Sequence, residues 1–122
     1  MPLARRQRRT LLHARAVRDH LAALELTLPT LLDRGAATAL HFWFANYDGV
    51  RELLFPKLPL AYAAWRGGDD GRALRGAAAA GTLHFRTLAG QVLALHERLG
   101  SQAGPAIERL LTAPQAVFTM AP

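Results

Sequence analysis

Apolar residues in this chain recur three and four positions apart, and no stretch of useful length alternates between apolar and polar residues. This spacing places apolar side chains on one face of an α-helix, whereas a half-buried strand would need a period of two. The clearest case is the stretch 28–44, which has Thr27 as a cap before it and Pro29 in its first turn. Its predicted inner face consists of Leu28, Leu32, Ala36, Ala39 and Trp43. The spacing predicts an all-α fold.

Gly35 lies in the middle of a predicted second helix that runs from Pro29 to Ala45 and ends in turn residues. A glycine inside a helix costs roughly 1 kcal/mol relative to alanine. We therefore expect another helix to pack closely against the segment around Gly35.

Two further helical regions lie on either side of this segment. Residues 3–26 predict a first helix, and its apolar side is made of Ala14, Val17, Leu21 and Leu24. The region 50–65 is apolar and helix-spaced, but Pro56 and Pro59 interrupt it. Each proline removes a backbone N–H and clashes with the preceding turn, so we expect a kink or two short helices there.

After the exposed loop 67–71, residues 72–99 predict one long helix, or two joined near Gly81, that ends at Gly100. Its predicted inner face consists of Leu83, Leu88, Val92, Leu95 and Leu99. A short last helix is expected over 106–111. The predicted fold is therefore a compact all-α bundle of five or six helices in a single domain, residues 1–112, followed by a C-terminal tail, residues 113–122.

Composition limits the classes of function. The chain has 122 residues, enough for one core, and no cysteine, which excludes disulfides, thiolate metal sites and a cysteine nucleophile. No apolar run approaches the ~18 residues of a membrane span, so we expect a soluble cytoplasmic protein without a membrane partner. The formal net charge of +6, with all but one of the 15 Lys and Arg residues being arginine, favours a polyanionic partner.

The first predicted helix concentrates this charge. Its outer side is rich in arginine, and Asp19 is the one acidic residue near it. A guanidinium group binds phosphate oxygens in a bidentate manner, so such a face suits a nucleic-acid backbone and does not read bases. An ordinary solvated face is the alternative interpretation.

Histidines are the first candidates for metal or acid–base chemistry, and the five are His13, His20, His41, His84 and His96. The stretch YDGVRELLFPKL resembles the hemerythrin-like family, but the metal-binding His and Glu of that family fall on Asn46 and Val50 here. We therefore expect no metal and no cofactor, and we expect all five histidines to be polar residues on helix surfaces.

Two weaker patterns point to other functions. Arg15 and His20 have the Arg-x4-His spacing of helical HEPN-type ribonucleases, in which an arginine could stabilise phosphorane charge while a histidine moves a proton. The residue after the arginine is Ala16 here, where those nucleases usually have a polar residue. Among the aromatic residues, Trp65 is the one we expect at a surface or partner contact.

The first half of the chain resembles the small subunit of type III, Cmr-type CRISPR RNA-guided effector complexes. The matching residues are Gln7, Leu28-Pro29, Leu31-Leu32, Gly35 and Ala39-Leu40-x-Phe42. Ala36 and Ala37 depart from the larger apolar residue that the family tends to have after the glycine. The resemblance implies a compact helical bundle that is not an enzyme and that serves antiviral defence as a stackable block.

The partners that the resemblance implies are RNA, as guide and target strands contacted at the backbone, other subunits of the effector complex and copies of the same protein. The residues predicted to face nucleic acid are Arg5, Arg6, Arg8, Arg9, Arg15 and Arg18, with Arg72 and Arg75 as second choices. Reversing three of them to glutamate should weaken RNA binding and flatten its salt dependence. The alternatives are a degenerate hemerythrin-like or HEPN-like protein, or an accessory protein of another assembly.

Overall fold

The computed structural model describes residues 2–119, and every regular element in this range is helical. The α-helices are α1 (Pro2–Ala22), α2 (Leu28–Asp33), α3 (Ala37–Ala45), α4 (Gly49–Leu54), α5 (Leu58–Arg66), α6 (Arg72–Leu99) and α7 (Gly104–Thr112). A π-helical turn, η1 (Ala23–Thr27), joins α1 to α2, and the 3-10 turns η2 (Gly100–Gln102) and η3 (Pro114–Ala116) flank α7. The predicted all-α class is confirmed.

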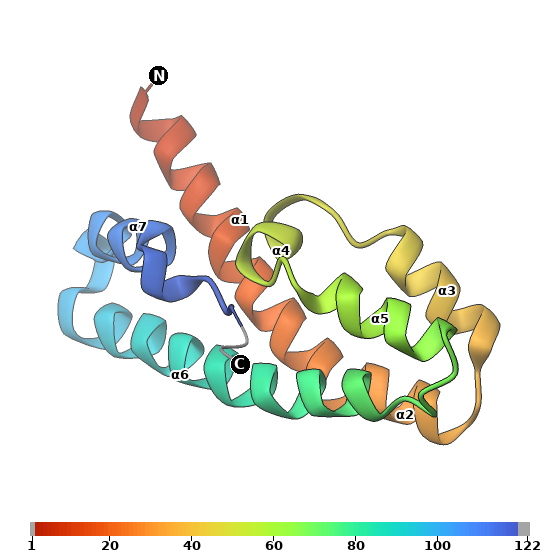
Figure 1. The fold of residues 1–122 in the computed structure, drawn as a ribbon. Coiled ribbons are helices and arrows are strands. Elements are labelled where there is room, and N and C mark those ends of the chain that lie inside the picture. The colour runs from red at the N-terminus through yellow and green to blue at the C-terminus, as the bar shows by residue number, and fades with distance from the viewer. Residues whose placement is uncertain (1, 120–122) are drawn as a thin grey trace.

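The long helix α6 is the element around which several other helices are arranged (Figure 1). It packs against α1, α5 and α7, and α1 also contacts α4 and α7. The largest fully buried side chains come from α1, η1, α2, α3, α5, α6 and the end of α4, and they include Val17, Leu24, Leu28, Leu40, Phe55, Leu58, Leu74 and Phe85. One continuous core therefore runs along the inner side of α6.

The predicted second helix, from Pro29 to Ala45, is wrong because the chain breaks into α2 and α3 at Gly35. Gly35 has a φ of +61°, its N–H donates to the carbonyl of Leu32, and the N–H of Ala36 donates to the carbonyl of Leu31. This pair of bonds is the Schellman ending of a helix, which requires a left-handed residue. No atom of another element lies within 4 Å of a Cβ built at Gly35, so the predicted close packing of a helix there is also wrong.

The other helix boundaries agree with those predicted from the sequence. The prolines split the third region into α4 and α5, α6 is a single helix, and it stops at Gly100, where φ is +56°. The carboxylate of Asp69 accepts hydrogen bonds from the N–H groups of Gly71 and Ala73, which satisfies donors at the start of α6. The predicted loop 67–71 therefore also caps the longest helix.

The predicted inner face of α6 is wrong in part. Leu83 is 66% exposed and Leu99 is 38% exposed, whereas Phe85 is fully buried. The helix turns its side with Leu74, Ala77, Ala78, Gly81, Phe85 and Leu88 to the core. Leu83 lies on the opposite side and faces solvent.

Residues 113–119 of the predicted tail pack onto the body. The N–H of Phe118 donates to the carbonyl of Leu54 at 2.8 Å, and its ring lies edge-on to Phe55 with centroids 4.9 Å apart. The Nε2 of His84 lies 2.8 Å from the carbonyl oxygen of Ala116. This segment therefore covers one end of the core between α4 and α6.

Candidate nucleic-acid interface

The N-terminal part of α1 extends beyond the other helices (Figure 1) and carries most of the arginines that the sequence singles out. The side chains of Arg5, Arg8, Arg9, Arg15 and Arg18 are all exposed. Two ion pairs occur among the described residues, and they join Arg75 to Asp33 and Arg86 to Glu25. The five arginines on α1 thus have no carboxylate partner within the part of the chain that the structure describes.

The charge of α1 lies at the unfavourable end of the helix. The first turn holds no acidic residue, although the N-terminus of a helix is the positive end of its dipole and favours carboxylates. Arg5 lies in this first turn, where its charge adds to that of the helix end, and Arg8 lies one turn further along. An anion bound beside them would relieve the repulsion.

The exposed arginines are spread along the helix. At a rise of about 1.5 Å per residue, Arg5 and Arg18 are ~20 Å apart along the axis, and Arg8 and Arg15 are ~10 Å apart on nearly the same face. Leu11 and Leu12 lie between them and are 68% and 58% exposed. The outer side of α1 is therefore a cationic surface with a small apolar patch inside it.

Arg6 belongs to α1, but its side chain lies outside the described residues. Arg72 and Arg75 lie in the first turn of α6, beside α2 and at the opposite end of the molecule from the N-terminus (Figure 1). Arg75 is bound to Asp33, with its Nη1 2.6 Å from the carboxylate. The structure therefore places this pair apart from the α1 arginines.

The prediction that all five histidines are surface residues is wrong for His20, which is fully buried. Its ring stacks on Phe85 with centroids 4.6 Å apart, and its Nε2 lies 2.8 Å from the carbonyl oxygen of Arg51. Arg15 points to solvent from the other side of the same helix. The hypothesis of an Arg15–His20 nuclease pair is therefore wrong for this fold, because the imidazole has no access to a substrate.

His20 is part of a buried polar cluster that ties α1 to the end of α4. The hydroxyl of Tyr47 donates to the carbonyl of Phe55 at 2.8 Å and lies 3.2 Å from the Nε2 of His20. Burial lowers the pKa of His20 to about 4 and raises the pKa of Tyr47. The imidazole is thus neutral at pH 7, with its Nε2–H directed at the carbonyl of Arg51.

The aromatic residues of α3 and α5 are a second feature of the surface. Trp65, which the sequence predicts at a contact, is half-buried and stacks on Tyr62 with centroids 5.9 Å apart. The guanidinium carbon of Arg66 lies 4.7 Å from the centre of the Tyr62 ring. Phe42, which belongs to the motif of the resemblance, is 72% exposed on the outer side of α3. Phe44 of α3 stacks on Tyr62 of α5 with centroids 4.2 Å apart, so aromatic contacts help to hold α3 onto α5.

The described residues offer little for other chemistry. No group of three or more His, Cys, Asp or Glu side chains among them could hold a metal ion. A groove of about 510 Å³ between α6 and α7 is lined by His84, Thr87, Leu88, Gln91, Leu110, Ala113 and Gln115. It carries no Arg or Lys to bind a phosphate. Within residues 2–119, no helix is both long enough and apolar enough to cross a membrane.

Comparison with known proteins gives the family. Residues 1–114 match the C-terminal domain of a family of unknown function, DUF6866, and the chain belongs to this family. No curated protein and no solved structure matches the chain. The family description names no substrate, activity or partner.

Proposed function

We propose that this DUF6866 C-terminal domain is a non-catalytic nucleic-acid-binding subunit of an RNA-guided CRISPR effector complex of the type III kind. The observation that carries the proposal is the row of exposed arginines on α1, none of which pairs with a carboxylate among the described residues. The resemblance of the first half of the chain to Cmr-type small subunits supplies the class of complex. The all-α architecture agrees with that class.

The chemistry of α1 suits contact with phosphates and not with bases. Arginine forks bind phosphate oxygens in pairs, and the arginines from Arg5 to Arg18 span ~20 Å of one helix, enough for several successive phosphates. Base recognition needs amide or carboxylate groups placed at base edges, and the row offers none. A guide RNA that reads sequence by pairing leaves its protein subunits to bind the backbone alone.

The arginines on α6 have a smaller part in this proposal. Arg75 is held by Asp33, and both Arg72 and Arg75 lie in the first turn of α6, away from the N-terminal part of α1.

A matched pair of double variants tests the proposal. Arg8→Glu with Arg15→Glu changes the charge of the α1 surface, and Arg34→Glu with Arg98→Glu makes the same change at exposed positions outside α1. Binding of a short fluorescent single-stranded RNA is measured for both at equal salt. The α1 variant should lose at least tenfold more affinity than the control. Equal losses would overturn the proposal, because they would show a response to net charge alone.

An acidic protein partner is a second candidate, and the exposed Leu11 and Leu12 favour it. Contact with a phosphate backbone does not require leucines between the arginines, whereas an amphipathic acidic helix would bury them. Isolation of the protein from its own cells at low salt, with and without ribonuclease, separates the two. A partner that leaves after ribonuclease treatment supports the RNA proposal, and a protein that stays bound supports this one.

A further inference from the structure

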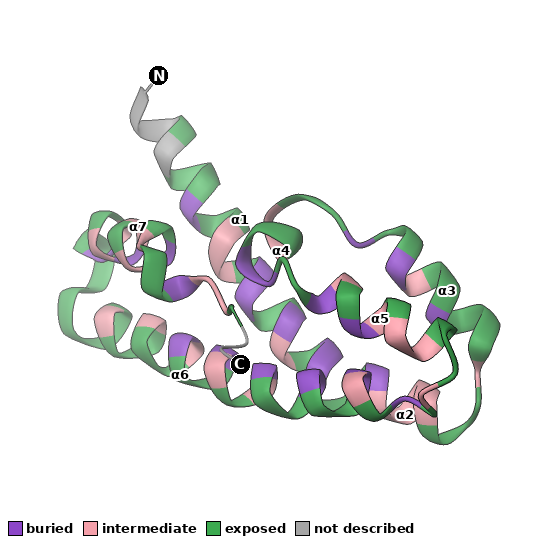
Figure 2. Cartoon of the chain, viewed as in Figure 1, coloured by how far each residue is buried: buried purple, intermediate pink, exposed green. Residues whose placement is uncertain are grey.

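Two leucines interrupt the row of arginines on α1. Figure 2 shows that most of the described residues in this part of α1 are exposed. Between Arg9 and Arg15 the exposed positions are occupied by Leu11 and Leu12 alone, which are 68% and 58% exposed. A contact with phosphates only would leave both leucines in water. The proposed binding of an RNA backbone therefore does not by itself explain them.

The two leucines and two of the arginines form one patch on the helix. Arg8, Leu11, Leu12 and Arg15 are separated by intervals of three and four residues, at which neighbouring side chains of a helix have Cβ atoms about 5–6 Å apart. The leucines occupy the middle of this set, and an arginine stands at each end, with ~10 Å between the two along the helix axis. We call these four residues the leucine patch.

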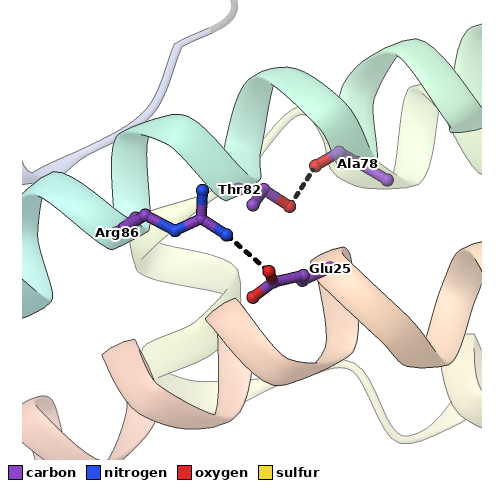
Figure 3. A network of polar contacts seen from close by, with 4 residues as sticks. All are labelled: Glu25, Ala78, Thr82 and Arg86. Atoms are coloured by element: carbon purple, nitrogen blue, oxygen red, sulfur yellow. Dashed lines mark hydrogen bonds and ion pairs between the residues drawn. The ribbon is translucent and has the colours of Figure 1, made fainter.

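The two arginines of the leucine patch have no carboxylate partner among the described residues. On α6, by contrast, Arg86 reaches across to Glu25, with its Nη2 2.5 Å from the carboxylate (Figure 3). On α1 the nearest acidic residue is Asp19, which follows Arg15 by one turn and lies outside the patch. A polyanion that passes over α1 therefore meets two available guanidinium groups with an apolar surface between them.

We infer that the leucine patch binds an unpaired nucleotide of a single-stranded RNA, with Arg8 and Arg15 on the phosphates to either side and the leucines against the base. This inference rests on the proposed binding of RNA by α1. The face of a base is apolar enough to pack on aliphatic side chains, and leucine serves as a wedge between bases in proteins that open the stack. Every base has such a face, so the contact adds affinity without a sequence preference.

A duplex does not offer the same contact. In a paired helix the neighbouring bases cover both faces of each base, and the wide, shallow groove of A-form RNA presents 2′-hydroxyl groups and base edges. Burial of Leu11 and Leu12 against these polar groups would gain little. An unpaired strand can turn a base out of the stack so that its face lies on the leucines. The leucine patch therefore selects single-stranded RNA over duplex RNA.

A matched pair of double variants tests the inference. Leu11→Gln with Leu12→Gln removes the apolar surface of the patch without a change of charge, and Leu60→Gln with Leu83→Gln makes the same change at positions of similar exposure on α5 and α6. Both variants keep the five exposed arginines of α1. Affinity is measured by fluorescence anisotropy for a single-stranded RNA and for a strand of equal length made of abasic ribose units. The two ligands have the same phosphates and differ in their bases.

The wild type and the control variant should bind the RNA about fivefold more tightly than the abasic strand, which is the lower end of what one stacked base contributes. The variant with glutamine at positions 11 and 12 should bind both strands equally. The salt dependence of its RNA binding should match that of the wild type, because no phosphate contact is lost. Its affinity for a blunt RNA duplex should also match that of the wild type, since paired bases do not reach the leucines.

Equal binding of the RNA and the abasic strand by the wild type would overturn the inference and leave the proposed contact with phosphates standing. A variant that keeps the fivefold preference without Leu11 and Leu12 would do the same. A wild type that binds neither strand would overturn both the inference and the proposed function.

Discussion

Replacement of Gly81 by alanine should destabilise the protein even though alanine is the better helix former. A Cβ at Gly81 would lie 2.8 Å from Leu24 Cδ1 and from Phe55 Cε2, whereas carbon atoms pack at about 3.5–4.0 Å. Neither neighbour has room to move, because Leu24 is 1% exposed and Phe55 is fully buried. Overpacking of this kind costs about 1–3 kcal/mol, against a gain of roughly 1 kcal/mol in helix propensity.

Gly90→Ala is the matched control, because it makes the same chemical change in the same helix with no atom within 4 Å of the new methyl group. It should raise the free energy of unfolding by about 0.5–1 kcal/mol. Gly81→Ala should lower it by about 1 kcal/mol, which corresponds to a fall of roughly 3–6 °C in Tm for a domain of this size. The difference between the two variants isolates the cost of packing.

Urea denaturation followed by circular dichroism measures both variants. Both variants and the wild type are measured at the same low micromolar concentration. A Gly81→Ala variant as stable as Gly90→Ala would refute the packing of Leu24 and Phe55 against α6 described above.

Two further predictions concern the buried cluster on α1 and α4. The pKa of His20 is lowered from 6.5 to about 4, so between these pH values the unfolded chain binds a proton that the folded chain does not. Stability from this residue is therefore complete above pH 6.5 and is lost as the pH falls, by about 3 kcal/mol in all. His20→Gln should lose less stability than the wild type between pH 7 and pH 4 in urea titrations, and equal losses would contradict the burial of a neutral imidazole. Tyr47→Phe removes the hydrogen bond to the carbonyl of Phe55 and should lower the free energy of unfolding by about 1–2 kcal/mol at pH 7. An unchanged urea midpoint would show that the hydroxyl is not needed there.

The sequence predicted the helical class because apolar spacing and proline positions act locally. The prolines at 56 and 59 remove backbone donors wherever the chain lies, so the break between α4 and α5 followed from them directly. The sequence shows a glycine at position 35, but it does not decide the backbone conformation of Gly35. A glycine inside a helix and a glycine that ends one look the same until the direction of the chain after it is known.

The inner face of α6 was misassigned because the helix carries leucines on several sides. Leu88, Val92, Leu95 and Leu99 share one stripe, but Leu83 lies about 140° from Leu88 at 100° per residue, whereas Phe85 lies about 60° from it. Helical spacing alone therefore favoured Phe85 over Leu83 as the buried residue beside Leu88. His20 was misassigned although it follows the buried Val17 by three residues and precedes the buried Leu24 by four. This spacing was a usable signal for burial.

The arginine row on α1 was the part of the candidate site that the sequence located well. Helical periodicity alone separated the outer arginines from the apolar side, and the exposure of Arg8 and Arg15 agrees with it. Contacts between residues far apart in the sequence could not be predicted in the same way. The contact of Arg75 with Asp33 joins residues 42 positions apart, and it depends on how α2 meets α6.

The salt dependence of RNA binding tests the proposal most directly. If the five exposed arginines on α1 each neutralise one phosphate of a single strand, the logarithm of the binding constant should fall against the logarithm of salt concentration with a slope of about −3.5. Replacement of Arg8 and Arg15 by glutamine should reduce this slope to about −2. A wild-type slope near zero, or the same slope in the variant, would show that α1 does not bind the backbone.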